Sequence, residues 1–211
     1  MIKIYSSEYS VKLDDANFFR YLKLMPIEMA EKILRFKRWQ DRQASLYGKL
    51  LLKKGLDELG FDSSLTNLNY TQYGRPYIPH FPDFNISHSN GFVVCAIATE
   101  GKIGVDIEQI KPTPIYDFRN QFSENEWNVI IASDNIYALF YYYWTAKEAA
   151  IKANGKGFSL PLENITIKDN KTIIEQTQWY IKRIFLSNTY MLNIACNKII
   201  EQEIQPLKIP L

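Results

Sequence analysis

Two acidic residues, Asp106 and Glu108, lie in the segment 103–108 (IGVDIE), whose alternating apolar and polar residues predict a β-strand. Residues two positions apart in a strand point to the same face, so both carboxylates project together while Val105 and Ile107 face the core. Adjacent carboxylates raise each other's pKa unless a cation neutralises them, and Mg2+ is a cation that prefers oxygen ligands. The pattern fits a metal site, although taken alone it more often marks an exposed acidic pair on an edge strand.

A second group lies in the segment 144–152 (WTAKEAAIK), within a predicted helix from about residue 136 to 153. Trp144, Glu148 and Lys152 are successive i,i+4 neighbours and therefore share one helix face. Glu148 and Lys152 could form an ordinary surface ion pair, which contributes only about 0.3–0.5 kcal/mol. A large aromatic ring on the same face favours a cleft over an open surface.

A third group follows the predicted strand 84–87, where His88 lies between the hydroxyl side chains of Ser87 and Ser89. Hydroxyls and free backbone N–H groups at a strand end can converge on a phosphate group. A lone histidine in a turn more often has a structural role. His80, between two apolar neighbours, is assigned no role.

The composition describes a folded protein without a strong overall charge. The chain has 211 residues, 46% of them hydrophobic, and a formal net charge of +2. One compact domain or two small lobes fit this length, and the near-neutral charge gives no reason to expect a nucleic-acid or membrane partner. Both cysteines lie in apolar runs, which suits reduced thiols. No signal segment or long apolar run is evident, so a cytoplasmic location is expected.

The predicted elements run in the order strand, helices, strands, helices, strands. Pro26 begins a helical stretch that continues to about Leu59, and Ser123 and Glu126 have the spacing of a helix capping box. Strands are predicted at 68–70, 76–78, 84–87, 92–98, 103–108, 165–167, 179–186 and 190–196. The repeated order predicts two α+β lobes that meet near residues 104–112, with the division at 1–104 and 105–211.

Taken together in order and spacing, these groups resemble the conserved blocks of the 4′-phosphopantetheinyl transferases, in particular the longer, monomeric, surfactin-synthetase-activating type. The resemblance covers about residues 26–162. The matching segments are 35–48, Tyr73-Gly74-Arg75-Pro76, Asn85–Ser89, Gly104–Glu108 with Lys111-Pro112, Trp144–Glu148 with Lys152, and Gly155-Lys156-Gly157.

The resemblance implies an α+β pseudo-dimer of two similar lobes with the active site in the cleft between them. Its expected activity is the transfer of the 4′-phosphopantetheine arm of coenzyme A to a serine of an apo acyl or peptidyl carrier protein. Adenosine 3′,5′-bisphosphate is the expected second product, and Mg2+, or Mn2+ in its place, the expected metal. The alternative is an inactive relative that binds coenzyme A or a carrier domain without chemistry.

The resemblance also implies roles for individual residues. The expected metal ligands are Asp106, Glu108 and Glu148, and the expected catalytic residues are Asp106, Glu148 as general base, and Lys152 at the reacting phosphate. The expected contacts to the coenzyme A nucleotide and its phosphates are Lys32, Ser45, Arg75, Ser87, His88, Lys147 and Lys152, with a helix contact as the alternative for Lys147. One departure is Met29, at a position where the family often has a basic residue, and Arg35 could substitute for it.

Overall fold

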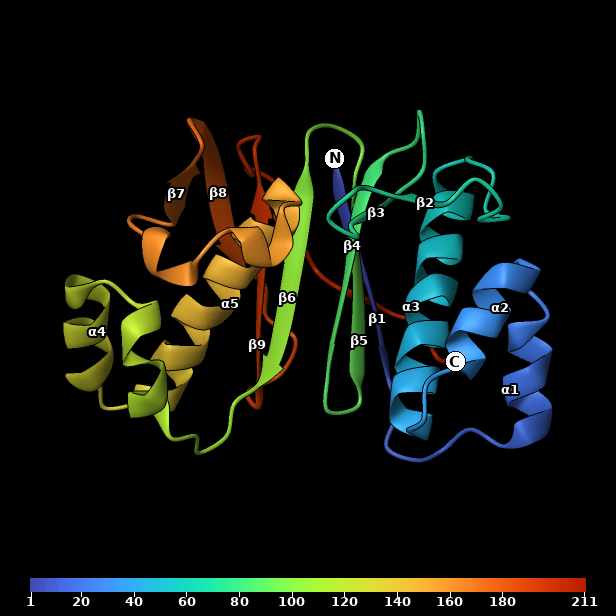
Figure 1. The fold of residues 1–211 in the computed structure, drawn as a ribbon, viewed down its shortest axis with the longest axis horizontal. Coiled ribbons are helices and arrows are strands. Elements are labelled where there is room, and N and C mark those ends of the chain that lie inside the picture. The colour runs from blue at the N-terminus through green and yellow to red at the C-terminus, as the bar shows by residue number, and fades with distance from the viewer.

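The computed structural model covers residues 1–211 and describes all of them except the side chain of Phe158. It has two lobes, each built on a four-stranded sheet with one long helix packed against it (Figure 1). The elements before the crossover are β1 (Ile2–Glu8), α1 (Asp15–Leu22), α2 (Ile27–Leu34), α3 (Trp39–Glu58), β2 (Asn69–Tyr70), β3 (Pro76–Tyr77), β4 (Asp83–Ser89) and β5 (Phe92–Ala98).

The second series of elements repeats the strand–helix–strand order. It comprises β6 (Ile103–Gln109), the 3-10 helix η1 (Ile115–Gln121), α4 (Glu124–Ile131), α5 (Ile136–Asn154), the 3-10 helices η2 (Gly157–Ser159) and η3 (Leu162–Asn164), β7 (Lys171–Ile174), β8 (Thr177–Arg183), β9 (Tyr190–Cys196) and β10 (Leu207–Lys208). This mixed α+β architecture with two lobes confirms the predicted fold class.

The two sheets have the strand orders β10-β1-β5-β4 and β6-β9-β8-β7. All pairs within them are antiparallel except β1 with β10, which is parallel. The last strand of the chain therefore joins the sheet of the first lobe. The chain crosses from one sheet to the other between β5 and β6.

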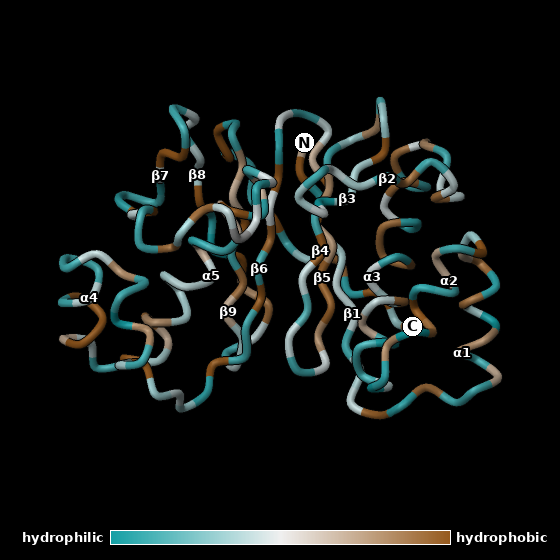
Figure 2. Tube along the Cα trace, viewed as in Figure 1, coloured by the Kyte–Doolittle hydropathy of each residue, from teal (hydrophilic) through white to brown (hydrophobic). Residues whose placement is uncertain are grey.

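The hydrophobic core has a part in each lobe and a part shared between them. One cluster lies under α3, around Leu51 and Val93, and another lies under α5, around Ala149 and Trp179. A third cluster joins the facing sides of the two sheets, around Val94 and other buried residues of β5, β6 and β9. In Figure 2 hydrophobic residues concentrate along β5 and β9, in agreement with this arrangement. None of the described helices has the length and apolar composition of a membrane-spanning segment.

The helix that carries Glu148 ends as the sequence predicts. Gly155 caps α5 in the left-handed conformation, with φ of 87°, and its N–H donates to the carbonyl of Ile151 at 2.9 Å. The helix lies unusually close to β6 at Gly104, where an added Cβ would come within 2.0 Å of the Ala149 carbonyl oxygen. The capping box predicted from Ser123 is also present at the start of α4.

The structure corrects the prediction of one helix over residues 26–59. The helix is interrupted at 35–38, and Arg38 is extended, with φ of −85° and ψ of 137°. Arg42 Nε donates to the Phe36 carbonyl at 2.6 Å, which satisfies an acceptor that the interruption releases. Because the segment is interrupted, α2 and α3 can each turn their own apolar face toward the core.

Two further differences lie near the C-terminus. The predicted strand at 165–167 is coil, in which Ile165 and Ile167 are buried and the Ile167 N–H donates to Glu126 Oε1 at 2.8 Å. The final segment, whose structure was not predicted, contains β10, which pairs with β1 at Tyr5 and Leu207. Both outcomes depend on partners that are distant in the chain.

Candidate active site

The two lobes meet where β4 lies beside β6, between α3 and α5 (Figure 1). Alternate side chains of β4 accept hydrogen bonds from backbone N–H groups of β6. The pairs are Asn85 Oδ1 with Val105 N (2.9 Å), Ser87 Oγ with Ile107 N (3.3 Å) and Ser89 Oγ with Gln109 N (3.2 Å). We call this row of side-chain contacts the seam. It fixes the register of the strand that carries Asp106 and Glu108 against the strand that carries His88.

Asp106 is the most deeply buried acidic residue of the site, with 3% of its surface exposed. Its Oδ1 accepts from Lys152 Nζ at 2.5 Å and from Ser87 Oγ at 3.0 Å. Its Oδ2 is buried and has no hydrogen-bond partner among the described residues. A buried carboxylate oxygen without a donor is costly, so this atom indicates a place for an additional positive or hydrogen-bonding group.

Glu108 and Glu148 are the two other predicted metal ligands, and both are half-buried. Burial raises the pKa of Glu148, and the charges of Asp106 and Glu108 raise it further, while Lys152 opposes them. Burial also raises the pKa of Glu108, as does Asp106, although the hydrogen bond from Ser89 Oγ to Glu108 Oε2, 2.8 Å, lowers it. The charge of Lys152 therefore opposes the raised pKa of both glutamates, while its ammonium group is in direct contact with Asp106.

Whether these residues fit a divalent cation can be judged from their donors. Among the side chains that the structure describes, no three of the Asp, Glu, His or Cys type are assembled as a ready metal-binding group. The site nevertheless supplies carboxylate oxygens, which suit Mg2+, and the orphaned Oδ2 of Asp106 is one of them. The mutual repulsion of the carboxylates is also what a bound cation would relieve. The donor set therefore fits the metal.

A cavity of about 340 Å³ opens on the α3 side of the seam. Its polar lining includes Ser45, Lys49 and His88, and Tyr70 contributes an aromatic ring. Lys49 Nζ donates to Ser45 Oγ at 3.2 Å, and Lys32 Nζ lies 4.9 Å from the centre of the Tyr70 ring. The structure thus brings the predicted residues Lys32, Ser45 and His88 to one side of the carboxylates, where an anion would meet several donors.

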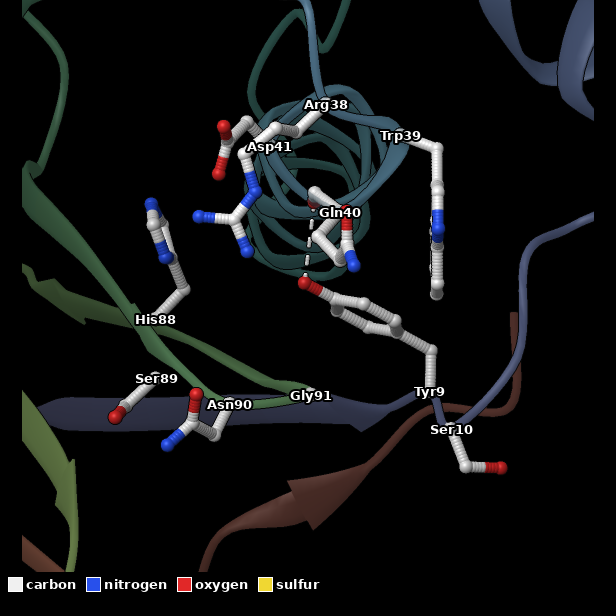
Figure 3. A pocket seen from close by; sticks show the side chains of 10 residues that line it. All are labelled: Tyr9, Ser10, Arg38, Trp39, Gln40, Asp41, His88, Ser89, Asn90 and Gly91. Atoms are coloured by element: carbon white, nitrogen blue, oxygen red, sulfur yellow. Dashed lines mark hydrogen bonds between the residues drawn. The ribbon is translucent and has the colours of Figure 1, made fainter.

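Figure 3 shows a neighbouring cavity of about 480 Å³, which shares His88 with the first. Arg38 and Asp41 from the start of α3 lie above His88 in this view, and Tyr9 lies opposite, with its hydroxyl donating to the Gln40 carbonyl at 3.2 Å. The polar space along α3 therefore extends past the histidine toward the β4–β5 turn.

On the α5 side of the carboxylates, a third cavity of about 480 Å³ has mainly apolar walls. Trp144 and Phe118 line it together with Glu148 and Lys152, so the aromatic ring predicted to share a face with these charges does so. The two rings pack edge to face, with centroids 5.3 Å apart. The carboxylates thus stand between a polar space on one lobe and an apolar space on the other.

Arg75 and Lys147, both predicted to contact phosphate, form ion pairs with buried carboxylates instead. Arg75 is buried and makes a bidentate pair with Asp83, with Nη–Oδ distances of 2.8 and 2.7 Å. Lys147 is fully buried; its Nζ lies 2.8 Å from Glu126 Oε2 and donates to the Gln121 carbonyl at 2.7 Å. Burial lowers the pKa of Lys147, although the Glu126 carboxylate opposes this. Neither residue lines the cavities described above. The contacts of Lys147 with η1 and α4 correspond to the alternative prediction of a helix contact.

Met29 stands where the family often has a basic residue, and Arg35 was predicted to substitute for it. The two side chains lie in different environments. Met29 is buried in the core under α3, whereas Arg35 is exposed at the C-cap of α2. The Met29 side chain therefore contributes to packing, and the exposed Arg35 guanidinium group is accessible to an anion.

The structure places Lys49 in the site, which the sequence did not predict, and gives Ser89 contacts with β6 and Glu108 in place of the predicted approach to a phosphate. Lys49 lies one helical turn after Ser45, and its half-buried ammonium group, whose pKa is lowered by burial and by the charge of Lys32, faces the same cavity as His88. Ser89 both accepts from β6 and donates to Glu108. The i,i+4 spacing after Ser45 and the alternation along 83–89 were the available signals.

The fold and the site define a two-lobed α+β protein in which opposed carboxylates and a lysine lie between a polar, anion-compatible space and an apolar one. Family models give this class its identity. Residues 102–195 match the 4′-phosphopantetheinyl transferase superfamily, and residues 13–100 match the N-terminal region described for 4′-phosphopantetheinyl transferases.

Curated relatives agree over most of the chain. The 4′-phosphopantetheinyl transferase Sfp of Bacillus subtilis (strain 168) is 34% identical over 206 residues, which covers 92% of each chain. A second 4′-phosphopantetheinyl transferase of Bacillus subtilis is 35% identical over 172 residues, covering 79% of this chain and 76% of the relative. The L-aminoadipate-semialdehyde dehydrogenase-phosphopantetheinyl transferase of Xenopus laevis is 28% identical over 215 residues, covering 86% and 71%. The chain belongs to the 4′-phosphopantetheinyl transferase superfamily and to that class of enzymes.

Proposed function

We propose that the enzyme transfers the 4′-phosphopantetheine group of coenzyme A to a serine hydroxyl of an apo acyl or peptidyl carrier protein and releases adenosine 3′,5′-bisphosphate. The serine oxygen attacks the phosphorus that carries the pantetheine arm, and the bond from that phosphorus to the bridging oxygen breaks. The observation that carries this proposal is the cluster of three carboxylates around Lys152, with the unpartnered Oδ2 of Asp106 at its centre.

The residues of the cluster divide the work of the transfer. Asp106, Glu108 and Glu148 would hold Mg2+, which when bound neutralises charge on the pyrophosphate. Glu148 accepts the serine proton, because burial and the neighbouring carboxylates raise its pKa and so make it a stronger base than an exposed glutamate. Lys152 neutralises negative charge at the reacting phosphate once coenzyme A draws its ammonium group away from Asp106.

The polar cavity beside α3 is the proposed site of the nucleotide. Its donors Ser45 and His88 suit phosphate oxygens, as does Lys32, which lies over the ring of Tyr70 in the cavity wall. Lys49 adds a further positive or donor group that was not expected from the sequence. Ser87 donates to Asp106 and lies at the junction between this cavity and the carboxylates, which suits its predicted contact with the phosphates of the coenzyme A nucleotide. Arg75 and Lys147 are not included, because carboxylates already neutralise their buried charges.

We also propose that the protein acts as a monomer, because one chain supplies the walls on both sides of the carboxylates. The polar wall comes from α3 and β4, and the apolar wall from α5 and the 3-10 helices. Light scattering on the purified protein measures this directly: a mass of one chain is expected at the concentrations used for the activity assay, and an obligate dimer would contradict it.

The activity is tested by incubating the protein with coenzyme A, Mg2+ and a panel of apo acyl and peptidyl carrier domains. We expect adenosine 3′,5′-bisphosphate and holo carrier to accumulate in equal amounts, excess chelator to stop the reaction, and Mg2+ or Mn2+ to restore it. Asp106→Ala should abolish transfer while circular dichroism remains that of the wild type. Binding of coenzyme A without any product would instead support the inactive relative, and full activity in chelator would refute the metal ligands.

A further inference from the structure

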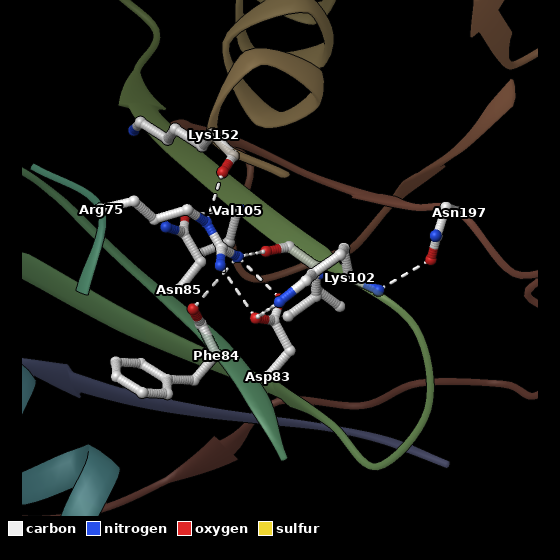
Figure 4. A network of polar contacts seen from close by, with 9 residues as sticks. Arg75, Asp83, Phe84, Asn85, Lys102, Val105, Lys152 and Asn197 are labelled. Atoms are coloured by element: carbon white, nitrogen blue, oxygen red, sulfur yellow. Dashed lines mark hydrogen bonds and ion pairs between the residues drawn. The ribbon is translucent and has the colours of Figure 1, made fainter. Parts of the chain in front are cut away.

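Arg75 belongs to the first lobe, but two of the five hydrogen bonds of its side chain are with the second. Within its own lobe its two terminal nitrogens form the bidentate pair with Asp83 (Figure 4). From the same guanidinium, Nε donates to the Lys152 carbonyl at 2.9 Å and Nη2 to the Ile103 carbonyl at 2.8 Å. Only 8% of the arginine side chain and 7% of the aspartate side chain are exposed. Planar guanidinium geometry suits several fixed partners at once.

Asp83 completes the bridge from the other side. Its Oδ2 accepts from the Ile103 N–H at 2.8 Å, so both backbone groups of Ile103 are held by this one ion pair. Asp83 is also the first of the alternating β4 residues that bond to β6, which places the pair at the end of the seam. Lys102 Nζ lies 3.1 Å from Asp83 Oδ1 but is largely exposed.

The ion pair binds the backbone of Lys152 and of Ile103. These positions are close in the chain to the side chains of the proposed chemistry, Lys152 itself and Asp106. The Lys152 carbonyl lies in the last turn of α5, where carbonyls lack helical partners and a cation is favoured by the helix dipole. Ile103 begins β6, three positions before Asp106. The Arg75 side chain also packs tightly against the end of α5, since a Cβ added at Gly155 would lie 2.8 Å from Arg75 Cδ.

We propose that Arg75 and Asp83 are positioning residues, which hold the backbone of Lys152 and the start of β6 so that Lys152 Nζ meets Asp106 and the reacting phosphate. On this proposal Arg75 does not contact coenzyme A, in place of the phosphate contact predicted from the sequence. The inference rests on the proposed function, because it concerns the placement of a residue given a role there. Misplacement by about 1 Å can cost up to about a hundredfold in rate, so a pair remote from the substrate can still control turnover.

The rest of the seam makes the proposal testable in a folded protein. Asn85, Ser87 and Ser89 keep their bonds to β6 when Arg75 is changed, and the shared apolar core between the sheets is untouched. Three variants are informative. Arg75→Met removes the bridge between the lobes, and Arg75→Lys keeps the positive charge but loses the planar guanidinium group. Asp83→Asn weakens the bridge without removing a cation that could bind a phosphate. Lys156→Met, which breaks an exposed ion pair near the same helix end, is the control.

The experiment measures turnover with an apo carrier domain, and the affinities of coenzyme A and dephospho-coenzyme A by calorimetry, well below each melting temperature. We expect Arg75→Met and Asp83→Asn to lower kcat by at least about tenfold, Arg75→Lys to recover only part of it, and the control to match the wild type. The ratio of the two affinities should stay within about twofold of the wild-type ratio in every variant, since no phosphate contact is lost. A ratio that collapses in Arg75→Met but not in Asp83→Asn would overturn the proposal in favour of a 3′-phosphate contact.

Hydrogen exchange gives a readout that does not depend on activity. In Arg75→Met, amides in peptides that contain Ile103 and the end of α5 should exchange faster than in the wild type, while peptides from β8 should not change. Unchanged exchange and unchanged kcat would overturn the proposal. Wild-type protein that transfers nothing to any carrier would contradict the proposed function instead, and the exchange measurement would then still decide whether Arg75 holds these segments.

Discussion

Replacing Lys147 by methionine should destabilise the protein far more than an ordinary surface substitution. The ammonium group is 2.8 Å from Glu126, and only 1% and 3% of the two side chains are exposed. Removing the cation leaves the carboxylate buried without its counter-charge, which typically costs about 3–5 kcal/mol. Since 1 kcal/mol shifts the melting temperature of a chain of this size by about 2–4 °C, the expected decrease is about 6–20 °C.

The assay is thermal unfolding followed by circular dichroism, with urea unfolding as a second measure of the free energy. Lys156→Met is the matched control, because its partner Glu175 and the lysine itself are exposed to 47% and 37%, so that its loss should lower the melting temperature far less than the loss of Lys147. Adding Glu126→Gln to Lys147→Met should recover part of the loss by removing the stranded charge. If Lys147→Met melts with the wild type, Lys147 is not the structural ion pair described here.

Three other predictions concern the site itself. Because burial and neighbouring carboxylates raise the pKa of Glu148 in the folded state, the folded protein binds a proton that the unfolded chain releases, and stability falls as pH rises through that window. Glu148→Gln should therefore raise the metal-free melting temperature at pH 7 and lose this advantage below about pH 4, where glutamate is protonated in both states; equal melting of the two proteins at pH 7 would contradict the shift. Dephospho-coenzyme A should bind more weakly than coenzyme A, and His88→Ala should narrow the gap, with charge-assisted contacts of about 1.5–3 kcal/mol each visible by calorimetry; equal wild-type affinities would exclude a 3′-phosphate contact. Lys152→Ala should lower kcat more than it weakens coenzyme A binding, because the contact strengthens as charge develops; an unchanged kcat would remove its catalytic role.

Local features of the fold could be predicted from the sequence. The strands that became β5 and β9, the capping box at Ser123 and the end of α5 at Gly155 depend on alternation, side-chain caps and glycine conformation within a few residues. The segment 165–167 was wrongly predicted as a strand because its alternation is satisfied by burial beside Glu126 rather than by a neighbouring strand. The pairing of β10 with β1 joins opposite ends of the chain, so no pattern of neighbouring residues in the sequence could predict it.

The candidate site shows the same division between local and distant information. Spacing alone placed Trp144, Glu148 and Lys152 on one helix face, and the structure brings that face to Asp106. Spacing in the sequence could not show which cationic side chains are neutralised by buried carboxylates. The carboxylate that pairs with Lys147 lies in another helix, and the contacts of Arg75 with Ile103 and Lys152 cross between lobes.

Transfer of phosphopantetheine is measured directly by the intact mass of an apo carrier domain after incubation with the enzyme, coenzyme A and Mg2+. We expect a gain of one phosphopantetheine group on the carrier, located by fragmentation at its acceptor serine. The gain should be absent with a carrier whose serine is replaced by alanine, and absent with the folded Asp106→Ala enzyme. A carrier mass that never changes with any acyl or peptidyl carrier domain would refute the proposed transfer, and one that changes equally with Asp106→Ala would refute the role of Asp106.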